Sequence, residues 1–132
     1  MKMIKMITYL AVLALVGGCS VFGGRRGVPM QSIENCTVTI IGEQKMTDIV
    51  MRAAHQKQWT PQTISDDTVR CTLNLRAHQV VVDVLCMESS FTIRYVSSEN
   101  MNYDPVVNTI NPKYNQWIRN LQREIIGQGM MR

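Results

Sequence analysis

The sequence has few of the residues, and none of the local motifs, that usually carry enzymatic or metal chemistry. It contains only two histidines, His55 and His78, and neither has a metal-ligand partner at a suitable spacing. It also has no Cys-x-x-Cys pair, Gly-x-Ser-x-Gly turn, His-Glu-x-x-His helix or phosphate-cradling glycine loop. We therefore expect no enzyme activity, no metal and no cofactor.

The apolar run at residues 6–16 is too short to cross a membrane as a helix. It would cover only about 17 Å, against roughly 30 Å for the hydrocarbon core of a bilayer. Lys2 and Lys5 precede the run and two glycines follow it. This layout is typical of a secretory signal peptide.

The predicted folded region also lacks an excess of charge of one sign. The chain has a formal net charge of +4, but much of it comes from basic residues near the two ends. Between residues 30 and 126 the basic and acidic residues nearly balance. The sequence thus lacks the basic surface expected of a nucleic-acid-binding protein.

Period-two alternation of apolar residues is present in several segments and predicts strands. One strand is expected at residues 36–40, and three more, joined by short turns, at 69–76, 80–86 and 91–96. A short extended piece around Pro61 is expected at an edge of the sheet, or outside it. The last three strands together predict an antiparallel meander.

Two further segments have the apolar spacing of helices. The first is expected to have Thr47 as its cap and to end near Lys57. The second has Asn111 as a good N-cap and Pro112 at its first position, and Gly127 is expected to stop it. We expect an α+β two-layer sandwich, with an antiparallel sheet of about four strands, both helices on one face and a polar opposite face.

Three cysteines, Cys36, Cys71 and Cys86, lie in the predicted domain. If Leu75 pairs with Val80 across the hairpin, Cys71 and Cys86 become diagonal neighbours about 7–8 Å apart, beyond the usual disulfide range. A disulfide from Cys36 to either of them stays open in an oxidising compartment. We favour the interpretation that all three are buried apolar thiols.

Two groups of residues are candidates for a binding surface. The arginines are expected on the exposed sheet face together with Asp83, where charged residues usually only keep a surface wet. The segment 97–104 is either a binding loop or an ordered connection, whose polar side chains bond the backbone while its tyrosine packs on the last helix. The candidate residues are Arg70, Arg76, Arg94, Asn100, Asn102, Tyr103 and Asp104.

The segment Val16-Gly17-Gly18-Cys19 resembles the cleavage motif of bacterial lipoprotein signal peptides. The resemblance implies transfer of a diacylglycerol, with fatty acids such as palmitate, to the Cys19 thiol, then cleavage before Cys19 and acylation of its amino group. Two or three acyl chains anchor a protein stably. Ser20 implies sorting to the outer membrane, facing the periplasm. The alternative is an ordinary secreted protein with a chance cysteine near its cleavage site.

These observations predict one small domain on a lipid anchor. The expected parts are a signal peptide (1–18), the lipidated cysteine and a flexible tether (19–32), a single α+β domain (33–127) and a disordered tail (128–132). Nearly all of the domain, in particular residues 74–83, 93–104 and 114–118, looks like a group of small bacterial lipoproteins of uncharacterised function. That resemblance implies fold and location but no activity.

Three functions remain as hypotheses. The leading one is a non-enzymatic module of the bacterial envelope that binds another envelope protein. The alternative is a small-ligand or glycan binder that uses the polar sheet face and the 97–104 loop. The third is an enzyme of unrecognised type, which needs a concave pocket with convergent titratable groups.

Overall fold

The computed structural model describes residues 27–131, which form two helices, a five-stranded sheet and a two-stranded sheet. The predicted signal peptide, Cys19 and the first part of the predicted tether lie outside the described residues. The elements in chain order are β1 (Val28–Pro29), β2 (Ile33–Thr37), α2 (Met46–Gln56), β3 (Thr60–Ser65), β4 (Thr68–Leu75), β5 (His78–Cys86), β6 (Ser90–Glu99), β7 (Thr109–Ile110) and α3 (Pro112–Gly129).

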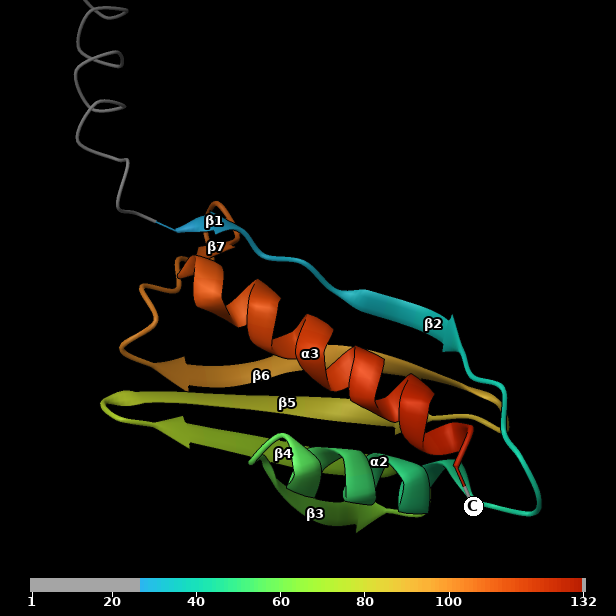
Figure 1. The fold of residues 1–132 in the computed structure, drawn as a ribbon. Coiled ribbons are helices and arrows are strands. Elements are labelled where there is room, and N and C mark those ends of the chain that lie inside the picture. Colours follow the sequence, from blue (N-terminus) through green and yellow to red (C-terminus); the bar gives the residue numbers. More distant parts are fainter. Residues whose placement is uncertain (1–26, 132) are drawn as a thin grey trace, which may run out of the picture.

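The main sheet has the strand order β2-β6-β5-β4-β3, and every neighbouring pair is antiparallel. Helix α2 packs on β3, β4 and β5, and α3 packs on α2 and β2, so both helices cover the same face (Figure 1). The predicted α+β fold is confirmed. The sheet has five strands rather than about four, because β3 pairs with β4 as an edge strand despite Pro61.

The core lies between the sheet and the two helices. From Val69 to Leu73 in β4 and from Val80 to Cys86 in β5 every second residue is buried, which is the pattern of strands covered on one face only, whereas Leu75 at the end of β4 is exposed. The side chains that are fully buried there come from both strands, from β6 and from one side of each helix. They include Ile49, Val50, Val69, Val80, Val82, Val84, Phe91, Ile93, Ile118, Leu121 and Ile125.

The hairpin between β4 and β5 is tighter than the sequence suggested. Leu75 pairs with His78 rather than with Val80, so the prediction of that register was wrong by two residues. The loop contains only Arg76 and Ala77, and Arg76 takes a left-handed backbone conformation with φ of 57°. Such a conformation suits the twist of a two-residue hairpin loop. His78 therefore lies in β5 and not in the turn.

Strand β2 begins earlier than predicted and is interrupted by a bulge. It covers Ile33–Thr37, and its register with β6 shifts between Ile33 and Cys36, where Asn35 has φ of 47°. Beyond the strand, Val38 is still buried, as the alternation predicts. The bulge lets an irregular edge segment keep its apolar side chains toward α3.

Helix α2 begins at Met46, with Lys45 as its N-cap residue, so the prediction that Thr47 caps the helix was wrong. The Lys45 side chain makes no capping hydrogen bond. Met46 is buried in the core, and this packing extends the helix by two residues that the capping preference of the sequence does not favour. The C-terminal end is as predicted, since Lys57 is the C-cap residue.

Helix α3 begins as predicted, and the Asn111 side chain accepts a hydrogen bond from the Lys113 amide at 2.9 Å. The helix does not stop at Gly127 but continues to Gly129. Both Gln128 and Gly129 are buried, so the predicted disordered tail was wrong for these two residues. Gly129 lies against Val38 and Thr39, and its carbonyl accepts the Ile41 amide at 2.8 Å, which holds the last turn against the segment after β2.

Residues before the predicted domain boundary at 33 also belong to the fold. Strand β1 pairs with β7, and the Met30 amide donates to the Asn108 carbonyl at 2.9 Å. The side chain of Asn115 on α3 holds the next backbone groups: it accepts from the Gln31 amide at 2.9 Å and donates to the Pro29 carbonyl at 3.0 Å. Residues 28–31 therefore belong to the fold rather than to a tether.

Candidate functional site

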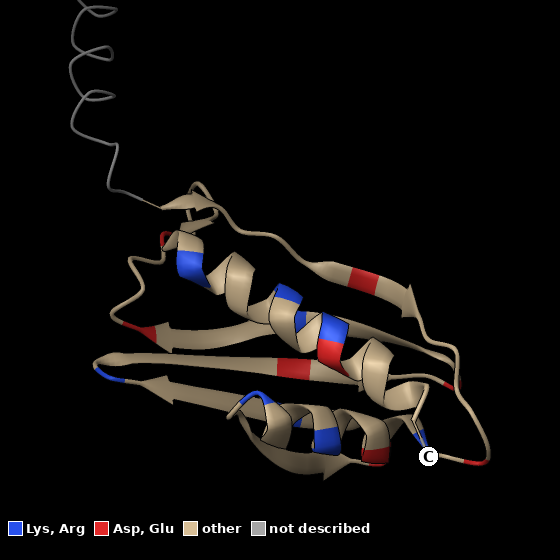
Figure 2. Cartoon of the chain, viewed as in Figure 1, with Lys and Arg blue, Asp and Glu red and all other residues tan. Residues whose placement is uncertain are grey.

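The face of the main sheet that is turned away from the helices is the largest candidate surface. The register of the strands places polar residues in rows across it, with half-buried Val81 and Leu85 near its centre. Figure 2 shows that basic and acidic positions are scattered over the chain and form no block of one sign. The face is thus mixed in character, neither strongly charged nor strongly apolar.

Three charged residues form one row across the middle of this face. Arg70 on β4 makes a two-pronged ion pair with Asp83 on β5, with Nε–Oδ1 and Nη2–Oδ2 distances of 2.8 and 2.9 Å. The hydrogen bonds to Asp83, and then its charge, raise the pKa of Arg70. Arg94 on β6 lies directly opposite Asp83 on the other side.

Arg94 is the available charge in this row. It is exposed, and within residues 27–131 it forms no ion pair. Because Arg70 already occupies both oxygens of Asp83, the guanidinium of Arg94 is free to bind a carboxylate or phosphate of a partner. With two arginines and one aspartate, the three residues of the row carry a formal net charge of about +1.

The remaining candidate residues lie away from this row, in the β4–β5 hairpin loop and in the segment after β6. Asn100 binds this hairpin, because its Nδ2 donates to the Ala77 carbonyl at 2.6 Å and its carbonyl lies 2.8 Å from Nδ1 of His78. Arg76, Asn100 and Asn102 all have left-handed backbone conformations. The seven predicted residues therefore form two separate groups, with only Arg70 and Arg94 together.

Tyr103 belongs to a stack of three tyrosines. Its ring centroid lies 4.4 Å from that of Tyr95, which in turn meets Tyr114 edge-on at 5.8 Å. Burial raises the pKa of Tyr114 and, to a lesser extent, that of Tyr95. Residues 97–99 thus belong to β6, and the connection that follows is held by its own side chains, with Tyr103 stacked on Tyr95 of β6.

The three cysteines in the described chain are free thiols. Cys71 lies opposite Val82, four positions along β5 from Cys86, so about 13 Å separates them rather than a diagonal step. Cys36 and Cys86 flank Phe91 from opposite sides, about 10 Å apart, which is also beyond disulfide range. Cys36 is only partly buried, and its sulfur accepts a hydrogen bond from Nε2 of Gln122 at 3.4 Å.

Within residues 27–131 neither histidine lies in a cluster of His, Cys, Asp or Glu side chains that could hold a metal ion. His78 lies beside Trp117, with 6.4 Å between the ring centroids, and His55 lies in the last turn of α2, as predicted. Among residues 27–131 no three His, Cys, Asp or Glu side chains are close enough together to hold a metal ion. In the same part of the chain no helix is long and apolar enough to cross a membrane.

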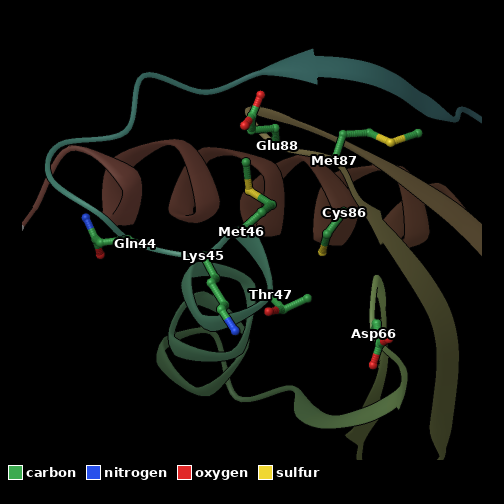
Figure 3. Close-up of a pocket in the computed structure, with 8 residues that line it drawn as sticks. All are labelled: Gln44, Lys45, Met46, Thr47, Asp66, Cys86, Met87 and Glu88. Atoms are coloured by element: carbon green, nitrogen blue, oxygen red, sulfur yellow. The ribbon is translucent and has the colours of Figure 1, made fainter.

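A cavity of about 370 Å³ lies between the first turn of α2 and the turn that follows β5 (Figure 3). Its walls carry Lys45, Asp66 and Glu88, and the side chain of Cys86 points toward it. Burial, and then the charge of Asp67, raise the pKa of Cys86 to about 12, so this thiol is protonated at neutral pH and is a poor nucleophile. Sequence reasoning missed this cavity, since the turn after β5 meets α2 only in the folded chain.

No family model, curated protein or solved structure matches this chain. Its function must therefore be argued from its own residues.

Sequence reasoning also missed the role of Asn115. The residue follows Tyr114 on the buried side of α3, where a polar side chain needs a partner. Its amide supplies one donor and one acceptor to the segment after β1, as a neighbouring strand would. In the sequence, the only sign of this role is that the polar Asn115 lies beside the apolar residues of the helix. That sign does not show which backbone groups Asn115 binds.

Proposed function

We propose that this protein is a lipid-anchored protein of the bacterial envelope, held in a membrane through Cys19, whose domain binds another envelope protein. The binding surface in this proposal is the open face of the main sheet. The role is non-enzymatic, and Ser20 favours the outer membrane, facing the periplasm.

The observation that carries the binding role is the exposed Arg94, which has no ion-pair partner among residues 27–131 and lies beside the paired Arg70 and Asp83. Half-buried Val81 and Leu85 lie on the same face. A flat surface with apolar centres and one available arginine suits a protein partner that carries a carboxylate, because arginine and partly apolar contacts are typical of interface centres.

The edges of the sheet are less suited to a partner strand than its open face. On one edge β3 contains Pro61 and a register shift after Thr63, and on the other β2 is short and bulged at Asn35. Prolines and bulges are devices that prevent strand addition at a sheet edge. This supports binding through side chains on the face.

The small-ligand or glycan alternative has less support. The loop at 97–104 uses Asn100 to bind the neighbouring hairpin, and Tyr103 stacks on Tyr95. The Asp104 carboxylate accepts the Val106 amide at 2.9 Å. These side chains are engaged within the domain, so the loop has few groups left for a ligand.

Photo-crosslinking in cells tests the binding surface. A photoreactive amino acid replaces Gln62, which lies next to Arg70 in the same row, and in a matched control it replaces Arg123, an exposed residue of α3. We expect a discrete adduct with one envelope protein from position 62 only. The R94A substitution should weaken this adduct about tenfold, the loss of a charge-assisted contact, without changing the melting temperature.

Two outcomes decide the proposal. Adducts that are the same at positions 62 and 123, or that do not respond to R94A, would overturn binding through the open face. Separately, C19A should release the protein from the membrane fraction, and unchanged fractionation would overturn the lipid anchor.

A further inference from the structure

The segment before α3 contains a small, well-defined hairpin. The Asp104 amide donates to the Thr109 carbonyl at 2.9 Å, and the Thr109 amide donates back to the Asp104 carbonyl at 3.2 Å. The Asp104 carboxylate accepts the amide of Val106, and Asn108 takes the left-handed conformation that closes the turn. The four residues between the paired positions therefore form a fixed turn.

The tip of this hairpin is apolar and exposed. Val106 is 89% exposed and Val107 is 62% exposed, and Val106 is the most exposed of the large hydrophobic side chains in the described chain. Turns usually carry Gly, Asn, Asp or Ser at such positions, because water solvates them. Two neighbouring valines on a fixed turn are suited to contact with an apolar phase.

The hairpin lies where the N-terminal segment joins the domain. A Cβ atom on Gly27 would lie 2.6 Å from the backbone nitrogen of Ile110, so the chain meets β7 in close contact there. β1 then pairs with β7, and the Met30 amide binds the Asn108 carbonyl. Figure 1 shows β1 and β7 together at one end of the domain, with the C-terminal end of α3 at the other.

The distance from the predicted anchor is short. Cys19 lies eight positions before Gly27 in the sequence, and a chain of that length reaches about 16 Å on average and at most about 29 Å. Helix α3, which leads away from this end, is about 27 Å long. A lipid on Cys19 therefore keeps the β1–β7 end of the domain nearest the bilayer.

The charges at this end also suit a phospholipid surface. Arg25 and Arg26 immediately precede Gly27 in the sequence, and Lys113 lies in the first turn of α3. The hydrogen bond from the Val106 amide does not remove the negative charge of Asp104, which offsets the charge of Lys113, so the excess of basic residues comes from Arg25 and Arg26 in the sequence. Basic residues beside an apolar tip favour an interface with anionic head groups.

We infer that the hairpin 104–109 inserts Val106 and Val107 into the membrane interface as a second contact beside the Cys19 acyl chains. The inference rests on the proposed lipid anchor. It orients the domain, because α3 then leads away from the bilayer and the open sheet face stays accessible to a partner.

The test uses the full chain, lipidated in a bacterial host and reconstituted in vesicles of phosphatidylethanolamine and phosphatidylglycerol. A C36S background removes the partly exposed thiol, and the buried Cys71 and Cys86 do not react in the native state. V106C then accepts an environment-sensitive dye. The matched control is M87C, because Met87 is 59% exposed and lies in the turn after β5, away from β7.

We expect the emission maximum of the dye at position 106 to shift to shorter wavelength in vesicles. A lipid that carries its spin label at the membrane interface should quench about half of the emission. The dye at position 87 should not respond. A protein that floats with the vesicles while position 106 behaves like position 87 would overturn the inference but not the anchor. A lipidation-competent chain that does not float would overturn the anchor, and the inference with it.

Discussion

Gly127 and Gly129 lie two positions apart on α3, in contrasting surroundings. A Cβ atom on Gly129 would lie 2.5 Å from Cγ1 of Val38 and 3.1 Å from the carbonyl oxygen of Thr39, whereas a Cβ atom on Gly127 would meet nothing within 4 Å. The last turn of α3 thus approaches the chain after β2 so closely that only glycine fits.

We expect G129A to lower the free energy of unfolding by about 1–3 kcal/mol, because the stiff valine side chain and the backbone must move. The matched variant G127A should raise it by about 0.5–1 kcal/mol, the usual gain for alanine in an exposed helical position. Urea unfolding followed by circular dichroism measures both values. Equal stabilities of the two variants would show that the contact relaxes at no cost.

At the scale of elements, the N-terminal segment is held to α3 by two side chains, because Asn115 binds its backbone and Nη1 of Arg119 donates to Oε1 of Gln31 at 2.7 Å. Asn115 is buried and has both a donor and an acceptor bond to residues 29–31. Strand β1 itself has only two residues, too few to be stable alone. The amide of Asn115 is therefore the buried link between the backbone of residues 29–31 and the helix layer.

The substitution N115D keeps the shape of the side chain but replaces the donor to the Pro29 carbonyl with an oxygen. We expect hydrogen exchange at the Met30 and Gln31 amides to become about tenfold faster or more, because a lost buried hydrogen bond costs about 1–3 kcal/mol. The control N120D, on a less buried side of the same helix, should leave these amides unchanged. Unchanged exchange in N115D would mean that β1 and β7 hold the segment without Asn115.

The elements also show where sequence patterns stop being informative. Alternation in β4 and β5 predicted correctly which side chains are buried, but the register between the strands was wrong by two residues. A shift of two residues keeps every side chain on the same face, so hydrophobic patterning cannot detect it. The left-handed backbone conformation of Arg76 closes the loop that sets this register. The sequence does not indicate such a conformation when the residue is not glycine.

For the whole molecule, the buried thiols link stability to alkaline pH. Burial, as the main cause, raises the pKa of Cys71 and of Cys86 from 9.0 to about 12. Below about pH 9 the thiols are protonated in both the folded and the unfolded chain, so they do not change stability. Above it the unfolded chain releases protons that the folded chain retains, and the free energy of unfolding falls.

We expect a loss of roughly 1.4 kcal/mol per thiol between pH 8 and pH 10, since each pH unit above the unfolded pKa contributes this amount. Urea midpoints at pH 7, 8 and 10 measure it. A double variant, C71A with C86A, is less stable at every pH because of lost packing, but its decline above pH 9 should be shallower. Parallel declines in the two proteins would contradict the role of the thiols.

The two proposed surfaces lie on different parts of the molecule and are compatible. The apolar tip at Val106 and Val107 extends from the end where β1 and β7 lie, and Arg94 lies in the middle row of the open sheet face. A domain held at one end by lipid and tip can thus present the sheet face to a partner in the same compartment.

Local patterns in the sequence were enough to predict the fold class, the buried face of β4 and β5 and the start of α3, because these depend on the local period of apolar residues and on the capping side chain of Asn111. The prediction of a lipidated Cys19 also comes from the sequence alone. Tertiary structure decided the hairpin register, the continuation of α3 past Gly127, and the division of the predicted surface into two groups. Each depends on contacts between residues far apart in the chain, such as Gly129 with Val38 and Asn115 with Pro29, which no local pattern encodes.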